Sequence, residues 1–174
     1  MAPTAIVVPV PEAAPAVDRW RRRYTQAARG GLPPHVTLLF PFVDDDGLEQ
    51  DDVAAVHGVL AGFAAVELEL RVFGPPLSSP STGAVLYLAP EPAAPFAAMT
   101  QALAAAFPDY PPYGGEFAEV VPHLTVALGD DAPAEEIRAD VERHLPIRAH
   151  AAEAWLAGRD DDRWLPRSRI RLAG

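Results

Sequence analysis

The pentapeptide Pro34–Leu38 reads Pro-His-Val-Thr-Leu, and the pentapeptide Pro122–Val126 repeats it 88 positions later as Pro-His-Leu-Thr-Val. By composition alone, five histidines and six threonines in 174 residues would give roughly 0.17 His-x-Thr triplets, and the sequence holds two. Each copy lies in an apolar stretch typical of a β-strand, in which residues two positions apart point to the same face. We therefore expect each histidine to share a face with its own threonine, while the residue between them enters the core.

The segments on either side of the two motifs follow the same order of predicted elements. Strands are expected at about 5–10, 35–42, 66–72, 84–88, 120–128, 147–156 and 164–172, and helices at about 16–28, 48–63, 94–107 and 133–145. A Pro- and Ser-rich stretch from Gly74 to Gly83 separates two similar halves, about 1–74 and 84–174, of a single domain. This order favours an α/β or α+β fold with a cleft between the halves.

Composition excludes several kinds of chemistry. The chain contains no cysteine and no lysine, so all 14 basic residues are arginine. A disulfide framework, a thiol nucleophile and a thiolate zinc site are excluded, as are a Schiff base, a lysyl-adenylate and a Walker-type phosphate loop. The net charge of −10 argues against a broad nucleic-acid-binding surface and favours a small or terminal substrate.

The sequence also limits where the protein is expected to act. No apolar run approaches the length of about 18 residues that a membrane span requires, and the N-terminus lacks the basic start of a signal peptide. We therefore expect a cytoplasmic protein without a membrane partner. Its length fits one domain that folds alone, and we expect a monomer.

Two imidazoles on one site suit attack at phosphorus. A neutral histidine removes a proton from water while a protonated one gives a proton to the leaving oxygen, and an ordinary pKa near 6.5 makes both forms available. The two threonine hydroxyls would donate hydrogen bonds to the non-bridging oxygens, where charge develops. This chemistry requires neither a metal nor a cofactor.

The paired motifs resemble those of the two-histidine (2H) phosphoesterase superfamily, which includes the LigT-like RNA 2',3'-cyclic phosphodiesterases, also named 2'-5' RNA ligases. The resemblance covers nearly the whole chain. It implies a bilobal α+β fold, in which two pseudo-twofold related lobes, each with an antiparallel-type sheet and outer helices, flank a central cleft. It also implies that His35 and His123 are catalytic and that Thr37 and Thr125 bind phosphate, without telling base from acid. Many LigT-like enzymes carry an arginine three residues after the second threonine, where this sequence has Leu128.

Other residues are weaker candidates for the site. Arg167 and Arg169 alternate with other side chains and would share a strand face, either holding phosphate in the cleft or blunting a solvated edge. Tyr110 and Tyr113 precede the second motif in a loop and are candidates for contact with a nucleobase. The arginines within 19–23 are expected on the exposed face of the first helix.

The leading hypothesis is a metal-independent phosphoesterase that opens a 2',3'-cyclic phosphate, or a related phosphodiester, of a nucleotide or RNA end. One alternative is a nucleotide-binding module on the same fold, which would bind nucleotides without releasing product. Another is a 2'-5' RNA ligase, since ligation is formally the reverse of ring opening by an RNA hydroxyl. The third is a partner-binding protein with fortuitous motifs, for which replacing both histidines would change no ligand affinity.

Overall fold

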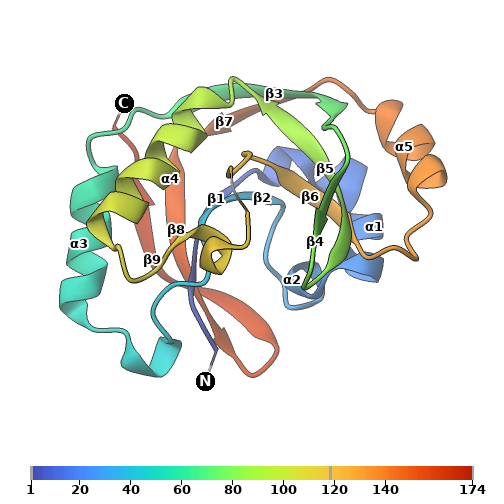
Figure 1. Ribbon diagram of the computed structural model, residues 1–174. Helices are drawn as coiled ribbons and strands as arrows, with labels where there is room; N and C mark the ends of the chain where they lie inside the picture. Colours follow the sequence, from blue (N-terminus) through green and yellow to red (C-terminus); the bar gives the residue numbers. More distant parts are fainter. Residues whose placement is uncertain (1, 118, 174) are drawn as a thin grey trace.

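Nine strands join in one curled sheet in the computed structural model, which describes residues 2–117 and 119–173 (Figure 1). The strands are β1 (Ala5–Pro9), β2 (His35–Leu39), β3 (Val66–Phe73), β4 (Leu77–Ser79), β5 (Gly83–Glu91), β6 (Leu124–Leu128), β7 (Ile147–Ala151), β8 (Glu153–Asp160) and β9 (Arg163–Arg171). The α-helices are α1 (Ala14–Tyr24), α2 (Gln26–Arg29), α3 (Gln50–Leu60), α4 (Ala94–Ala106) and α5 (Ala134–Glu142). Short 3-10 turns are η1 (Pro11–Ala13), η2 (Asp45–Gly47) and η3 (Pro112–Gly115).

The strand order is regular about the contact between β2 and β6. It runs β7-β3-β5-β6-β2-β1-β8-β9, with β4 paired to β5, and every pairing between these strands is antiparallel. On one side of the centre β8, from the second half of the chain, pairs with β1. On the other side β3, from the first half, pairs with β5. The stretches 1–74 and 84–174 are therefore interleaved, and each side of the sheet contains strands from both.

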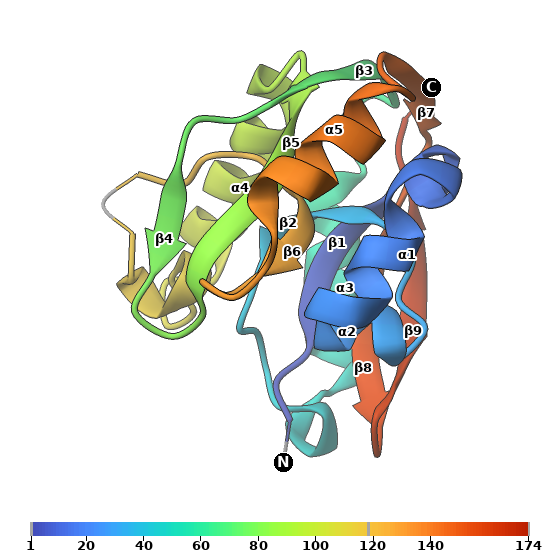
Figure 2. The ribbon, with the colours of Figure 1, turned by 90° about the vertical axis from the view of Figure 1, so that its right-hand side faces the viewer.

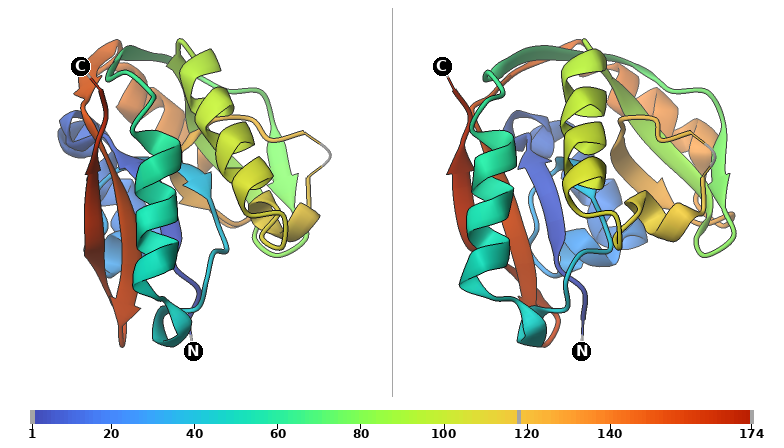
Figure 3. Two further views of the ribbon diagram at one scale, coloured as in Figure 1. Left: turned by 90° about the vertical axis from the view of Figure 1, so that its left-hand side faces the viewer. Right: turned by 60° about the vertical axis from the view of Figure 1, so that its left-hand side comes forward.

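The helices cover both faces of the sheet. Helices α1 and α5 contact each other on one face, and α3 and α4 lie side by side on the opposite face (Figures 2 and 3). Helix α1 follows β1 in the chain but contacts β6, whereas α4 follows β5 but contacts β2. These crossed contacts cover the two strands that carry the motifs and hold them together.

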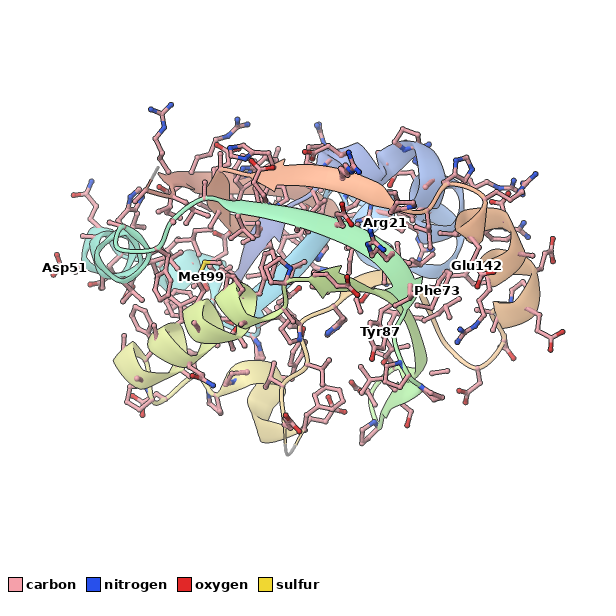
Figure 4. All side chains as sticks on the ribbon, turned by 90° about the horizontal axis from the view of Figure 1, so that it is seen from above. Arg21, Asp51, Phe73, Tyr87, Met99 and Glu142 are labelled. Atoms are coloured by element: carbon pink, nitrogen blue, oxygen red, sulfur yellow. The ribbon has the colours of Figure 1, made fainter. Side chains whose placement is uncertain are left out.

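Burial explains why these segments form strands and helices. All five residues of β1 are buried, as expected for a central strand with neighbours on both edges. Strand β2 alternates instead, because Val36 and Leu38 are buried while His35 and Thr37 are partly exposed. Figure 4 shows the same division in the helical layer, where Met99 of α4 lies inside and Asp51 lies on the outer side of α3.

The predicted mixed α+β class is confirmed, with three local corrections. The expected break from Gly74 to Gly83 contains the short strand β4, whose polar Leu-Ser-Ser sequence between prolines hid its pairing with β5. Residues 120–123 precede β6 rather than belonging to it, and the expected strand 147–156 is two strands, β7 and β8. Within the described residues, no helix is both long and apolar enough to cross a bilayer.

Candidate active site

The two motifs face each other across the centre of the sheet. Val36 of β2 pairs with Leu124 of β6 in antiparallel register, and both side chains are buried. Residues directly opposite each other in an antiparallel pair point to the same face. This register sets His35 against Thr125 and Thr37 against His123, so each histidine lies opposite the threonine of the other motif.

A cavity of about 450 Å³ opens on this face. Its volume is within the range of small-molecule sites. Its lining combines the four motif side chains with polar and apolar residues from α1, β4, η3 and the end of β6. The described lining residues used below are His35, Thr37, His123, Thr125, Arg21, Ser79, Ser81, Tyr113, Glu116, Phe117 and Leu128.

The His35 imidazole is held by the backbone beside it. Its Nδ1 donates a hydrogen bond of 2.9 Å to the Pro33 carbonyl, so the neutral ring carries its lone pair on Nε2. Burial lowers the pKa of His35 to about 4, and the nearby Arg21 guanidinium contributes to the same shift. At neutral pH this ring is an uncharged proton acceptor.

Arg21 lies on the inner side of α1, only 2% exposed. Its Nη2 donates to the Leu32 carbonyl at 2.9 Å and to the Pro33 carbonyl at 3.2 Å, while Nη1 donates to Asp18 at 2.8 Å. Because Pro33 also accepts the bond from His35, Arg21 fixes the carbonyl that orients the catalytic candidate. The expectation that the arginines of 19–23 are all exposed is wrong for this residue, which follows Val17 by one helical turn on the apolar face.

The His123 imidazole has the same backbone anchor but different neighbours. Its Nδ1 donates to the Val121 carbonyl at 2.7 Å. The Tyr113 ring stacks on it with a centroid distance of 5.9 Å, and the Tyr87 ring meets it edge-on at 5.4 Å. Burial lowers the pKa of His123, and the bond to Val121 opposes that shift. His123 is thus packed between aromatic rings, whereas His35 lies near the Arg21 guanidinium.

Tyr113 connects the two motifs. Its ring stacks on His123, and a hydrogen bond with the Thr37 side chain opposes the burial that raises the pKa of Tyr113 to about 12. Its backbone is left-handed, with φ of 53°, and its N–H donates to the Phe40 carbonyl at 2.5 Å. A non-glycine residue in this conformation is strained, and such strain clusters at functional sites. The structure thus places this candidate in the cavity wall.

The other three secondary candidates lie outside the cavity. Tyr110 packs edge-on against Phe42 with a centroid distance of 5.2 Å, as part of the core boundary. Arg167 donates hydrogen bonds to Asp45 and Asp160, and these bonds raise its pKa.

Arg169 lies over the Trp155 ring at 4.9 Å. The register of β9 against β8 shifts at Arg167, and β9 is an edge strand far along the sheet from β2 and β6, so neither arginine reaches the cavity.

Sequence reasoning missed two charged residues of the cavity. One is Arg21, discussed above, whose signal was an arginine at helical spacing from buried apolar residues. The other is Glu116, which accepts hydrogen bonds from Ser79 and Ser81 across the cavity rim. Nothing in the sequence links positions 35 apart in this way. Among the described residues, no group of three His, Asp or Glu side chains is arranged to hold a metal ion.

Comparison with known proteins gives a consistent picture. A family model described as the 2'-5' RNA ligase superfamily matches residues 9–163. No curated protein matches in sequence. Among solved structures, the protein TT0787 of Thermus thermophilus is 20% identical over 99% of this chain and 98% of that chain, with a TM-score of 0.65.

Two structures of E. coli LigT are also similar. LigT complexed with 3'-AMP is 15% identical, with a TM-score of 0.60 over 99% of this chain and 98% of that chain. LigT complexed with NADP+ is 17% identical, with a TM-score of 0.58 over 100% of both chains. At these identities the likeness establishes the fold.

Proposed function

The chain belongs to the 2'-5' RNA ligase superfamily, and from this membership we propose that it is a metal-independent phosphoesterase that opens a 2',3'-cyclic phosphate, or a related phosphodiester, of a nucleotide or RNA end. One observation carries the proposal. The pairing of Val36 with Leu124 brings two imidazoles and two hydroxyls to the same cavity. The nucleotides bound in the LigT structures support a small nucleotide ligand.

The proposed reaction needs one proton to move at each histidine. The neutral imidazole removes a proton from water through Nε2 as the water oxygen bonds to phosphorus. The bond from phosphorus to one ribose oxygen breaks, and the protonated imidazole gives its Nε2 proton to that oxygen. Hydroxyl groups of Thr37 and Thr125 donate to the non-bridging oxygens as charge builds on them. The net change is addition of water across one P–O bond.

The surroundings of the two rings assign their roles. His35 is the base, because burial and Arg21 keep it neutral down to a pKa of about 4. His123 is the acid, because burial lowers its pKa without the added effect of a neighbouring guanidinium, whereas the carbonyl bond that favours the charged form is common to both rings. If the roles were reversed, His35 would have to be protonated in the active form, although its low pKa makes it lose its proton readily.

The same site would support the reverse reaction. If an RNA hydroxyl replaces water, its attack on a cyclic phosphate forms a phosphodiester without ATP, since the energy of the strained ring drives the step. Ring opening by water and ligation therefore both require one histidine to remove a proton from the attacking hydroxyl and the other to donate a proton to the leaving oxygen. Water at its normal concentration favours hydrolysis as the main activity.

Turnover of the four nucleoside 2',3'-cyclic phosphates by the purified protein tests this proposal. The assay contains EDTA and separates the 2'- and 3'-phosphate products. We expect the wild type to turn over at least one substrate, and His35→Ala to lose about 10³-fold in kcat. His57→Ala is the matched control, because His57 lies on α3 and bonds Ser168 at 2.7 Å, away from the cavity.

Two results would oppose the proposal. Equal turnover by the wild type and His35→Ala would mean that another site, or a contaminant, opens the ring. Binding of 3'-AMP in a calorimeter without turnover of any cyclic substrate would identify a nucleotide-binding module instead.

A further inference from the structure

The charge of the cavity is unusual for a site that takes phosphate. Of the described residues that line it, only Arg21 and Glu116 carry a permanent charge. Both imidazoles have lowered pKa values and are largely neutral at pH 7. The lining therefore supplies no net positive charge beyond a proton carried by a histidine.

The one cation is already engaged. Arg21 donates to Asp18, to the Leu32 carbonyl and to the Pro33 carbonyl. Its guanidinium is paired with a carboxylate and held against the backbone, so three of its five N–H groups and its charge are already engaged within the protein. At position 128, where many LigT-like enzymes carry arginine, an apolar leucine lines the cavity.

The one anion among the described lining residues, Glu116, is solvent-exposed and is held by hydrogen bonds from β4 and the residues that follow it. The Glu116 Oε1 accepts a hydrogen bond of 2.7 Å from the Ser79 hydroxyl and one of 3.1 Å from the Ser81 N–H. Its Oε2 accepts from the Ser81 hydroxyl at 3.4 Å. These bonds lower the pKa of Glu116, so the carboxylate is ionised at neutral pH.

We propose that Glu116 selects for substrates that bring a single phosphate into the cavity, which favours a nucleoside 2',3'-cyclic monophosphate with a free 5'-hydroxyl over a 5'-phosphorylated nucleotide or an RNA end. This inference rests on the proposed function. A cavity of about 450 Å³ is on the order of 10 Å across, comparable to the Debye length in physiological salt. A second phosphate inside it therefore comes within about one Debye length of the carboxylate, and Arg21, the one cation among the described lining residues, is already paired with Asp18.

The experiment compares two substrates that differ in one phosphate. The value of kcat/KM is measured for adenosine 2',3'-cyclic phosphate with a 5'-hydroxyl and with a 5'-phosphate. The proteins are the wild type, Glu116→Gln and Glu119→Gln. Glutamine keeps an oxygen that accepts from Ser79 and removes only the charge. Glu119 is an exposed carboxylate three positions further along and is not among the lining residues, so it controls for a general change in charge.

The wild type is expected to prefer the 5'-hydroxyl substrate by about tenfold, and Glu116→Gln to reduce that preference by about fivefold. Glu119→Gln should leave it unchanged. Raising the salt concentration from about 50 to about 500 mM should weaken the preference in the wild type more than in Glu116→Gln. If the variant fails to fold, the salt dependence of the wild type alone still tests the inference, because a preference that salt does not weaken is not caused by charge repulsion.

Two results would overturn the inference. One is a wild type that prefers the 5'-phosphorylated substrate. The other is a Glu116→Gln variant that slows both substrates equally, which would make the carboxylate only a structural link between its neighbours. If the wild type opens neither substrate, the proposed function fails. The charge inference is then tested by calorimetry, which measures the affinities of the wild type and of Glu116→Gln for adenosine 3'-phosphate and adenosine 3',5'-bisphosphate. The second phosphate should weaken binding more in the wild type than in Glu116→Gln.

Discussion

The two Pro-His-x-Thr motifs are nearly identical in sequence but differ in what surrounds their histidines. Behind His35 lies a buried cation, since Arg21 and the ring share the Pro33 carbonyl as acceptor. Around His123 lie two tyrosine rings, Tyr87 and Tyr113. Each imidazole has the same anchor, an Nδ1–H bond to a carbonyl two residues earlier.

This difference shows how a repeated motif can perform two tasks. In the proposed reaction, the shared Nδ1 anchor leaves both Nε2 atoms available to the phosphate. Arg21 adds to the effect of burial on the pKa of His35, whereas burial without a cation lowers that of His123, and in the proposed reaction this difference separates the base from the acid. In the proposed reaction the motifs therefore set the geometry, and Arg21 of α1 sets which histidine is the base.

The largest effects should come from the histidines themselves. His35→Ala and His123→Ala should each lower kcat for a cyclic nucleotide by about 10³-fold, because each removes one of the two proton transfers. The double variant should be little worse than either single variant, since the two residues act in one step. Steady-state kinetics with circular dichroism as a folding control checks this. Additive losses would mean that the two rings work independently.

The threonines should behave alike even though the histidines do not. Thr37→Val and Thr125→Val keep the shape of the side chain and remove one donor to the phosphoryl oxygens, so each should lower kcat by about 10²-fold. The measurement is kcat for both variants at saturating substrate. A loss confined to one variant would show that the motifs do not share the phosphate evenly.

Arg21 sharpens the comparison through pH. In the proposed mechanism the productive form of the free protein has neutral His35 and protonated His123, so kcat/KM should be largest between their two pKa values, on the acidic side of pH 6.5. Arg21→Gln removes the positive charge near His35, which raises the pKa of His35 and shifts the acidic limb upward by about one pH unit. The alkaline limb, which belongs to His123, should stay in place.

The control for this shift is Arg22→Gln. Arg22 is the next residue of α1, and its side chain is 69% exposed. Arg22→Gln removes the same charge from a side chain that does not bind the Pro33 carbonyl, so both limbs of the pH profile should stay where they are. Arg21→Gln should also lower the free energy of unfolding by about 2 kcal/mol, because buried carbonyls lose their donor. Movement of the alkaline limb instead would assign the base to His123.

The smallest effect concerns stability. The pKa of His35 is about 4 in the folded protein and near 6.5 in an unfolded chain, so the unfolded chain binds more protons between these values. The contribution of neutral His35 to the free energy of unfolding is therefore complete above pH 6.5 and is lost as the pH falls toward 4. Because the ring is partly open to the cavity, the loss amounts to about 2 kcal/mol.

Urea denaturation at pH 7 and pH 4.5 measures this loss. His35→Gln should make the difference between the two pH values smaller by that amount. His144→Gln, which changes an exposed histidine just beyond α5, should leave the difference as in the wild type. Equal pH dependence in the wild type and His35→Gln would mean that His35 titrates normally in the folded protein.

The fold was predictable from sequence where local pattern decides it. Alternation in 66–72 and helical spacing in 94–107 depend on neighbours along the chain, and both elements form nearly where expected. The interleaving of β3 and β8 was not predictable, because strand partners are set by contacts between distant segments. Strand β4 was missed for the same reason, since its pairing with β5 and not its composition makes it a strand.

The site shows the same division. The motif residues and Tyr113 were identified from the sequence, and they line one cavity in the structure. The placement of Arg167 depended on which edge of the sheet β9 occupies, and the burial of Arg21 on the packing of α1 against β6. Hydrogen bonds between segments far apart in the chain, such as that from Ser79 to Glu116, leave no periodic signal in a sequence.

The division of work between the histidines is tested most directly by changing the leaving group. Bis(4-nitrophenyl) phosphate releases an oxyanion that needs little help from an acid, whereas a cyclic nucleotide releases a ribose oxygen that must be protonated. His123→Ala should therefore lose about 10³-fold in kcat/KM on the cyclic substrate but less than about tenfold on the aryl diester, while His35→Ala loses heavily on both. The opposite result would contradict the assignment of base and acid: His35→Ala nearly fully active on the aryl diester, and His123→Ala strongly impaired on it.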